Sequence, residues 1–471
     1  MMKRIKNLLK ASVFIFLCFA VMPLPVHAFD WEKLTFDGYI LNESAYQTEE
    51  SNKWFKCRNV LNLEFTYDFS PALRTFVQIR PIYDAAFDFG DRGIKGRKNM
   101  QKNWEDRASY DYDPLIREAW IEFASDKVEM RLGKQLVTWG TSDGFRLMDV
   151  VHSFNYRDLL KPADEDYKIP NWMVNLNYYF NPETGIQLLI VPRYIPSFSA
   201  PPVGHPWSFN VSGAIGNFIG AMAPLGVTFT DEEPATNWKN CTYGFRFRSR
   251  IESLDLDYTF NYLYTWDEFK VMVPDGPPIP GVGLPSAWKF RTDRLQIFGG
   301  TFSYRTTRLI PDTIIRGEFA YVKDDNFTNV NFVVEEQDHF DFLFGFDRYV
   351  GFFNFGPDKS DWWVSAQIKS SYLIDEGDYD YLNAGLAPID RWETLWTLLI
   401  TTDWYAEKLK LNLLFIGTDD GGLRTFPKFT WEFTNKLRAT LGYYFIRGDR
   451  SDFLGEFHDN DTIEMVWKYS F

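Results

Sequence analysis

Apolar and polar residues alternate along most of this 471-residue chain, the pattern of β-strands that carry one apolar face. In residues 59–69, apolar side chains stand at every second position from Leu61 to Tyr67, with polar residues between them. The same alternation recurs in residues 256–266 and 409–417. The chain is therefore expected to be all-β.

The alternation and the turn residues between runs predict about 18 strands, with about 16 as the alternative. The predicted strands cover residues 34–46, 57–69, 73–84, 115–125, 128–138, 171–180, 185–194, 242–251, 254–266, 293–305, 313–322, 339–349, 361–372, 391–404, 408–417, 422–433, 437–448 and 461–471. No separate soluble domain is expected, because strand segments follow one another along the whole chain.

Short and long connections take turns between these strands. The short ones carry hairpin residues and lie at 70–72, 125–127, 181–185, 252–253, 405–408 and 434–436. The long ones are polar or rich in Pro and Gly and cover 85–114, 139–170, 195–240, 267–292, 323–338, 373–390 and 449–460. A transmembrane antiparallel up-and-down barrel in the outer membrane has this asymmetry, with short periplasmic turns and long extracellular loops.

The N-terminal 28 residues have the features of a secretory signal peptide. A basic start precedes an apolar run, and Val26-His27-Ala28 places small or aliphatic residues where a signal peptidase cuts. Cleavage near Ala28 is expected to leave one barrel domain over residues 29–471. This leader indicates export, and the strand pattern then indicates the outer membrane of a Gram-negative bacterium.

The last eleven residues form one further amphipathic strand that ends on Phe471. Trp467, Tyr469 and Phe471 lie on its apolar face together with Ile463 and Met465. A terminal strand with an aromatic end is the signal read by the bacterial barrel-assembly machinery. We expect Trp467, Tyr469 and Phe471 to serve as that assembly signal.

Hydrocarbon forces such a sheet to close on itself. Every backbone N–H and C=O group must find a partner within the protein when lipid surrounds it, so only helices and closed sheets can span a membrane. A barrel of about 18 strands is too wide for its own wall side chains to fill. Water, loops folded inward, or both must then occupy the lumen.

One segment, residues 131–158, reads R-L-G-K-Q-L-V-T-W-G-T-S-D-G-F-R-L-M-D-V-V-H-S-F-N-Y-R-D. Its G-K-Q-x-x-x-W-G and D-V-V-x-x-x-N-x-x-D runs resemble a family of large proteobacterial outer-membrane barrels of unassigned function. Alginate-export-type barrels share a looser version. Lys134 stands where that family has arginine, and Tyr156 replaces a proline. The resemblance implies an outer-membrane location, is compatible with transport, and implies no substrate.

The part of this segment after Gly140 mixes apolar and charged residues, which favours a short helical turn packed inside the barrel over a loop in water. Its charged residues are Asp143, Arg146, Asp149, Arg157 and Asp158. The acids can pair with arginines that face the lumen. We expect a constriction or plug built from this loop, and the alternative is a loop ordered only by structural ion pairs.

A row of cationic side chains is expected on the lumen-facing side of one strand. In residues 242–251 the apolar positions are the odd ones, so Arg246, Arg248 and Arg250 share the inward face. Asp255 and Asp257 follow and can neutralise the lower end of this row. Basic rings select anions, which suggests polar or anionic solutes, unless the arginines are paired off to hold the plug.

Composition narrows the partners further. The chain carries a net charge of −14 and its first 28 residues hold four cations and no acid, so the remainder carries −18. That balance argues against nucleic acid and fits acidic loops that meet lipopolysaccharide through divalent cations. Outer-membrane lipid, the assembly machinery and a small polar solute are the expected partners. The solute and the oligomeric state, including a homo-oligomer, are left open.

Enzyme chemistry is not expected. The four histidines after the leader are scattered, and neither G-x-S-x-G nor H-E-x-x-H occurs. No haem, flavin or nucleotide motif and no defined metal-binding loop is present, so no cofactor or metal is expected. Cys57 and Cys241 are the only cysteines after the leader, and one pair does not establish a disulfide. The expected function is a porin-like channel, and the alternative is a barrel that sheathes a periplasmic electron carrier or an export complex.

Overall fold

The structure is a computed structural model of the whole chain. It describes residues 30–49, 52–89, 115–142, 145–155, 167–197, 221–306, 310–329, 331–351, 356, 360–374, 381–382, 389–449 and 454–471. Contacts divide the chain into residues 1–35 and residues 36–471. In the first unit, the described residues form the 3-10 turn η1 (Trp31–Lys33), in which Asp30 accepts the N–H of Glu32 at 3.1 Å. The predicted signal peptide and its cleavage site lie outside the described residues.

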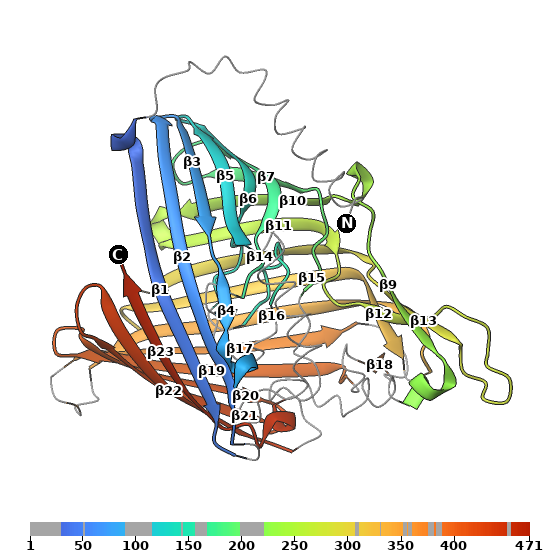
Figure 1. Cartoon of the computed structure of the whole chain (residues 1–471). Coiled ribbons are helices and arrows are strands. Elements are labelled where there is room, and N and C mark those ends of the chain that lie inside the picture. The colour runs from blue at the N-terminus through green and yellow to red at the C-terminus, as the bar shows by residue number, and fades with distance from the viewer. Residues whose placement is uncertain are drawn as a thin grey trace. The chain divides into compact units, whose positions relative to one another are not determined.

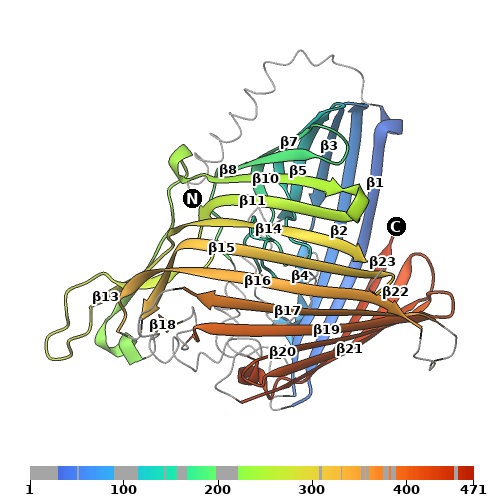
Figure 2. The same cartoon turned by 180° about the vertical axis from the view of Figure 1, so that it is seen from behind.

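Eighteen strands of the described residues form one antiparallel sheet that closes into a barrel. The strands are β1 (Leu34–Gln47), β2 (Trp54–Ser70), β3 (Leu73–Ile79) with β4 (Ile82–Asp84), β5 (Ile116–Ala124), β6 (Val128–Gln135), β7 (Asn171–Tyr179), β8 (Gly185–Val191), β10 (Thr242–Ile251), β11 (Leu256–Trp266), β14 (Arg294–Thr306), β15 (Thr313–Asn329), β16 (Val334–Val350), β17 (Trp362–Leu373), β19 (Trp392–Trp404), β20 (Leu409–Thr418), β21 (Leu423–Glu432), β22 (Leu437–Arg447) and β23 (Thr462–Ser470). Each strand pairs with the next along the chain, as Figure 2 shows for β14 to β17.

The first and last strands meet and close the ring. β1 and β23 pair in antiparallel register from Tyr39 opposite Ser470 to Gln47 opposite Thr462, and the two lie side by side in Figure 1. The backbone N–H of Phe471 also donates to the Gly38 carbonyl at 3.0 Å. No free edge is left at this seam, as the physics of a hydrocarbon solvent requires.

All the predicted strands are found, and the predicted count of 18 is confirmed. β3 and β4 together form one predicted strand, residues 73–84, since both pair with β2. The break between them falls at Pro81, which has no backbone N–H to give to the ladder.

The two faces of the wall differ in the way the alternation predicts. Along β11, Asn261 and Leu263 are buried on one face, whereas Phe260, next to Asn261 on the other face, is 55% exposed. Asn261 itself is only 5% exposed. The buried face points into the barrel, and the outward face carries exposed aromatic and aliphatic side chains along the other strands as well. The terminal strand follows the same rule, with Met465 outward and Glu464 inward.

One predicted long loop is wrong. Residues 323–338 were expected to be a loop, but β15 continues to Asn329 and β16 starts at Val334. A bulge between Val322 and Asp325 lets the two strands extend as one hairpin. The short strand β18 (Tyr381–Leu382) then adds to the end of β15. The sequence of this segment is as rich in charged residues as a loop, because neither face of the extended hairpin has to be apolar.

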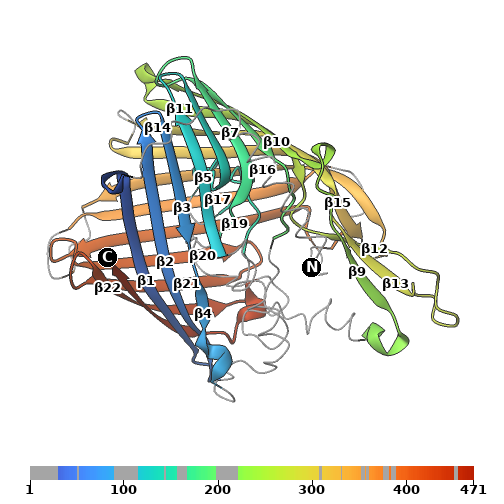
Figure 3. The same cartoon turned by 45° about the horizontal axis from the view of Figure 1, so that its top comes forward.

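Two other long loops join in a second small sheet that the sequence did not predict. It contains β9 (Thr228–Glu232), β12 (Val271–Pro274) and β13 (Ala287–Arg291), which lie together in Figure 3. β13 pairs with β12 in antiparallel fashion and with β9 in parallel. A small core around Met272 and Trp288 supports this sheet.

Besides residues 115 and 221–222, helical structure in the described residues is limited to short 3-10 turns. These are η2 (Ala85–Asp88), η5 (Ala223–Leu225), η6 (Trp238–Asn240), η7 (Glu252–Leu254) and η8 (Gly455–Phe457), besides η1. Among the described residues, no helix has the length and apolar character needed to cross a membrane. Cys57 and Cys241 are both free thiols.

Candidate functional site: a loop packed inside the barrel

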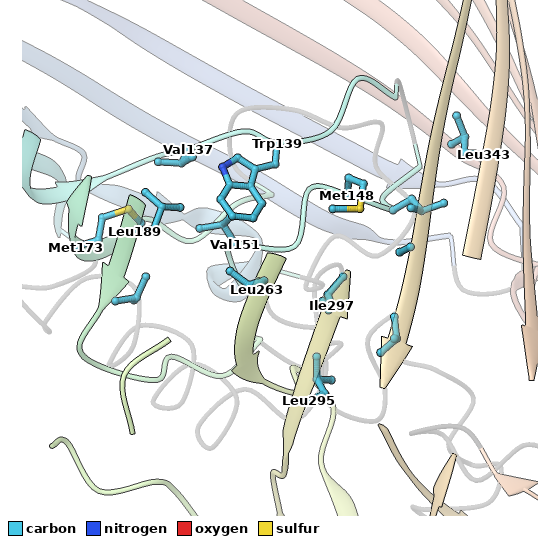
Figure 4. Close-up of a cluster of buried hydrophobic side chains, with 14 residues drawn as sticks. Val137, Trp139, Met148, Val151, Met173, Leu189, Leu263, Leu295, Ile297 and Leu343 are labelled. Atoms are coloured by element: carbon cyan, nitrogen blue, oxygen red, sulfur yellow. The ribbon is translucent and has the colours of Figure 1, made fainter. Parts of the chain in front are cut away.

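The connection between β6 and β7, residues 136–170, packs against the inner face of the barrel wall. We call it the lumen loop; its described parts are 136–142, 145–155 and 167–170. It contributes Val137, Trp139, Leu147, Met148 and Val151 to a buried apolar cluster (Figure 4). The wall completes this cluster with inward side chains from six strands, namely Met173, Leu189, Val191, Leu263, Leu295, Ile297, Ala320, Val322 and Leu343. The loop therefore occupies part of the barrel interior.

Trp139 is the largest side chain in this cluster, and the wall is shaped to receive it. Its indole Nε1 donates to Oε1 of Gln187 on β8 at 2.9 Å, and it is completely buried. The ring lies over Gly244 of β10, where a β-carbon would come within 2.9 Å of it. A glycine at position 244 is thus required by the close approach of the loop.

Glu318 of β15 holds the loop backbone from the wall. This carboxylate is 2% exposed. Its Oε1 accepts the backbone N–H groups of Thr141 and Ser142, the second at 2.7 Å, and its Oε2 accepts the N–H of Met148 at 2.8 Å. The Thr141 hydroxyl adds a bond at 3.1 Å. One buried charge thereby satisfies three donors of an irregular segment that has no sheet partner.

Arg316, on the same inward face of β15, holds the other side of the same peptide group. Its Nη1 donates to the Thr141 carbonyl at 2.5 Å. Its Nε lies 2.8 Å from Asp347 of β16, which balances the charge. Arg316 and Glu318 together fix both the N–H and the C=O of Thr141 to the wall.

Arg146 ties the loop to itself and to the segment that follows β11. Its Nε donates to the Asp149 carbonyl at 2.7 Å and its Nη2 to the His152 carbonyl at 2.8 Å. Its Nη1 pairs with Glu268, just beyond β11, at 2.5 Å. The guanidinium also stacks 4.3 Å from the ring centre of Phe154. The loop therefore has a fixed conformation at Arg146.

His152 joins the two legs of the loop and is neutral. Its Nε2 accepts the N–H of Val137 at 2.8 Å, so its Nδ1 carries the proton and donates to the Ile169 carbonyl at 3.0 Å. Burial lowers the pKa of His152 from 6.5 to about 4, although the nearby Asp149 carboxylate opposes this shift. A second proton on Nε2 would face the Val137 N–H and break the link.

The predicted loop residues are only partly brought together as expected. Arg146 and Asp149 both lie in the buried loop, but Asp149 pairs with Lys168 of the loop itself and with no wall arginine among the described residues. The expected helical turn is absent from residues 145–155, where polar partners on the wall take the place of helical hydrogen bonds. Asp143, Arg157 and Asp158 lie outside the described residues.

The predicted arginine row lies on the inward face of β10 and is largely engaged. Arg250 forms ion pairs with Asp255 and, at 3.4 Å, with Asp257, as the sequence predicts. Arg246 donates to the Thr138 carbonyl of the lumen loop at 3.1 Å. Arg248 stacks 4.8 Å from the ring centre of Tyr179. Holding the loop is therefore part of what this row does, and its role in lining a pore stays a prediction.

Several residues that anchor the lumen loop were not predicted from the sequence. Glu318, Gln187 and His152 were not identified as anchors, because they are far apart in the chain and meet only in the folded barrel. The available signal was an inward acid two positions after an inward arginine in an otherwise apolar strand, residues 313–322. Such a pair marks a place where the wall meets another polar segment.

Comparison with known proteins gives a family and a set of similar folds. The model of a family described as protein of unknown function (DUF1302) matches residues 50–350. No curated protein matches at the sequence level.

Three solved structures are similar in fold. Acinetobacter baumannii OccAB3 is 9% identical, with 93% of this chain and 99% of that chain covered and a TM-score of 0.49. Pseudomonas aeruginosa OccK5 (OpdH) is 9% identical, covering 94% and 99%, with a TM-score of 0.47. A loop-deletion mutant of OmpT, an outer membrane protein of Vibrio cholerae, is 8% identical, covering 93% and 99%, with a TM-score of 0.40. Because these TM-scores are below 0.5, we assign the barrel fold from the strand pairing of this chain and not from these similarities.

Proposed function

The chain belongs to the DUF1302 family of proteins of unknown function, and we propose that it is an outer-membrane channel for small polar or anionic solutes. Solutes cross by passive diffusion through a water-filled lumen that the lumen loop narrows. The observation that carries this proposal is a closed ring of strands, apolar outside, with a loop pinned to its inner wall by Glu318 and Arg316.

The outer face supports the membrane location. Exposed large apolar side chains recur on strand after strand, and a soluble protein rarely leaves so much apolar surface in water. Lipid is the solvent in which a closed sheet with this outer face is stable. Export through the predicted leader, folding by the barrel-assembly machinery and contact with lipopolysaccharide complete this proposal.

Charges on the inner wall support the proposed solute class. The wall carries both signs, such as Arg316 with Asp347 and Arg250 with Asp257, and opposed fixed charges favour polar solutes over apolar ones. A sheath for a large periplasmic partner is less well supported, because the lumen loop already takes up interior space on six strands.

Planar-bilayer recording of the pure mature protein tests the channel. We expect discrete conductance steps, and a reversal potential in a salt gradient that reports whether anions or cations pass more easily. A protein that inserts, is folded and stays closed at every voltage would contradict the proposal and favour the sheath.

A further inference from the structure

One buried arginine of the barrel wall leaves two of its guanidinium nitrogens without a hydrogen-bond partner. Arg424 of β21 is 3% exposed, and its Nε and Nη2 make no hydrogen bond to any residue that the structure describes. Leaving a guanidinium buried and unpaired is costly, because it has lost its water without gaining an anion. Such a group is suited to bind an anion.

The surroundings of Arg424 are apolar and aromatic. Its register partners are Ile416 on β20 and Ile446 on β22. Its guanidinium carbon lies 5.1 Å from the ring centre of Tyr444. That ring is stacked on Phe426 with centroids 3.9 Å apart and planes inclined by 18°. Arg424 is thus a single cation at the border of an apolar shelf made of Phe426, Tyr444 and the two isoleucines.

The nearest acid does not neutralise this cation. Glu464 of β23 lies within electrostatic range of Arg424. Its Oε1, however, takes Lys56 Nζ at 3.1 Å, and its Oε2 takes the Tyr444 hydroxyl at 3.0 Å. Both carboxylate oxygens therefore already serve other donors.

The lumen loop reaches the same part of the wall. Tyr167, near the end of the loop, lies within electrostatic range of both Arg424 and Tyr444. The end of the lumen loop therefore lies close to the Arg424 shelf.

We propose that Arg424 and the Phe426–Tyr444 pair form a binding subsite for a small carboxylate with an apolar body. The planar guanidinium matches a carboxylate through two parallel hydrogen bonds, and the shelf receives the apolar part. Inorganic phosphate shares the oxyanion chemistry but has no apolar body to place on the shelf. The subsite rests on the proposed channel function for its access from solution.

The test is titration calorimetry of the full mature protein in detergent, with benzoate, benzamide and inorganic phosphate as probes. We expect benzoate to bind, and benzamide and phosphate to bind much more weakly. Arg424→Gln should weaken benzoate binding by about tenfold or more, the size of one lost charge-assisted hydrogen bond. Arg424→Lys keeps the charge without the fork and should fall between. Arg305→Gln, the same change at an exposed arginine that pairs with Asp312, is the matched control and should leave binding unchanged.

Each outcome decides the proposal. No benzoate binding to the wild type, equal binding of benzamide, tighter binding of phosphate, or an unchanged affinity in Arg424→Gln overturns it. Heat-dependent migration on denaturing gels shows whether each variant is folded. If Arg424→Gln does not fold, the affinity of Arg424→Lys and the comparison of the three probes on the wild type decide the proposal. Conductance separates the two proposals: a conducting protein without benzoate binding refutes only the subsite, and Arg424-dependent binding without conductance refutes only the channel.

Discussion

Glu318→Gln is expected to free the lumen loop while leaving the barrel intact. The side chain keeps its size, but only one of its two terminal atoms remains an acceptor. In the wild type, Oε1 serves Thr141 and Ser142, and Oε2 serves Met148. Whichever way the glutamine amide turns, its NH2 group must face at least one backbone N–H of the loop.

The expected loss can be worked from these contacts. A hydrogen bond to a charged group contributes about 1.5–3 kcal/mol, and three backbone donors share this carboxylate. Allowing for water to replace part of the loss, the anchor weakens by about 4 kcal/mol, which raises the released fraction of the loop about a thousandfold until it saturates. The wall loses no strand pairing, because the Glu318 backbone stays paired with Thr301 and Leu343.

Single-channel recording measures this release. We expect a larger mean conductance and more open-channel noise in Glu318→Gln than in the wild type. Glu464→Gln is the matched control, because Glu464 is also a buried inward glutamate but serves Lys56 and Tyr444. A folded Glu318→Gln protein with wild-type conductance and noise would refute the anchoring role.

Three further predictions test the loop and the seam. Burial in the anchored loop lowers the pKa of His152 from 6.5 to about 4, so between these two pH values the released loop binds more protons than the anchored loop. Loop anchoring should therefore be complete above about pH 6.5 and weaken by on the order of 3 kcal/mol as the pH falls to about 4. Conductance titrated over this range should rise on acidification, and a rise that persists unchanged in His152→Gln would rule His152 out. Gly244→Val places a methyl-bearing carbon against Trp139 and should cost about 1–3 kcal/mol, seen as a shift of tryptophan fluorescence with strand circular dichroism retained; an unshifted spectrum contradicts the packing. Deleting Phe471, which bonds Gly38 across the seam, should lower the amount of protein recovered in outer membranes, and full recovery would exclude it as an assembly signal.

The strands could be predicted because their signal is local. Alternation such as that from Leu61 to Tyr67 reflects a strand whose two faces have different surroundings, and it needs no knowledge of distant residues. The prediction failed at residues 323–338, where β15 and β16 run on past their bulge and charged side chains occupy both faces. It also missed the parallel pairing of β9 with β13, which joins two loops that no local pattern connects.

The loop site was predictable in outline only. The mixture of apolar and charged residues around Arg146 and Leu147 indicated an inward segment, because such a mixture suits neither lipid nor bulk water. Its anchors were not predictable, since Glu318 lies 177 residues from Thr141 and becomes its partner only when the barrel closes. For the same reason Asp149 was assigned to wall arginines, although the fold places Lys168 beside it.

The most direct test of a channel narrowed by the lumen loop compares the wild type with a variant in which a short Gly-Ser linker replaces residues 140–168, both recorded in planar bilayers. We expect both proteins to insert and conduct, and the variant to pass a clearly larger current per channel. Equal currents would show that the lumen loop does not narrow the path, and the absence of current from both folded proteins would contradict the channel itself.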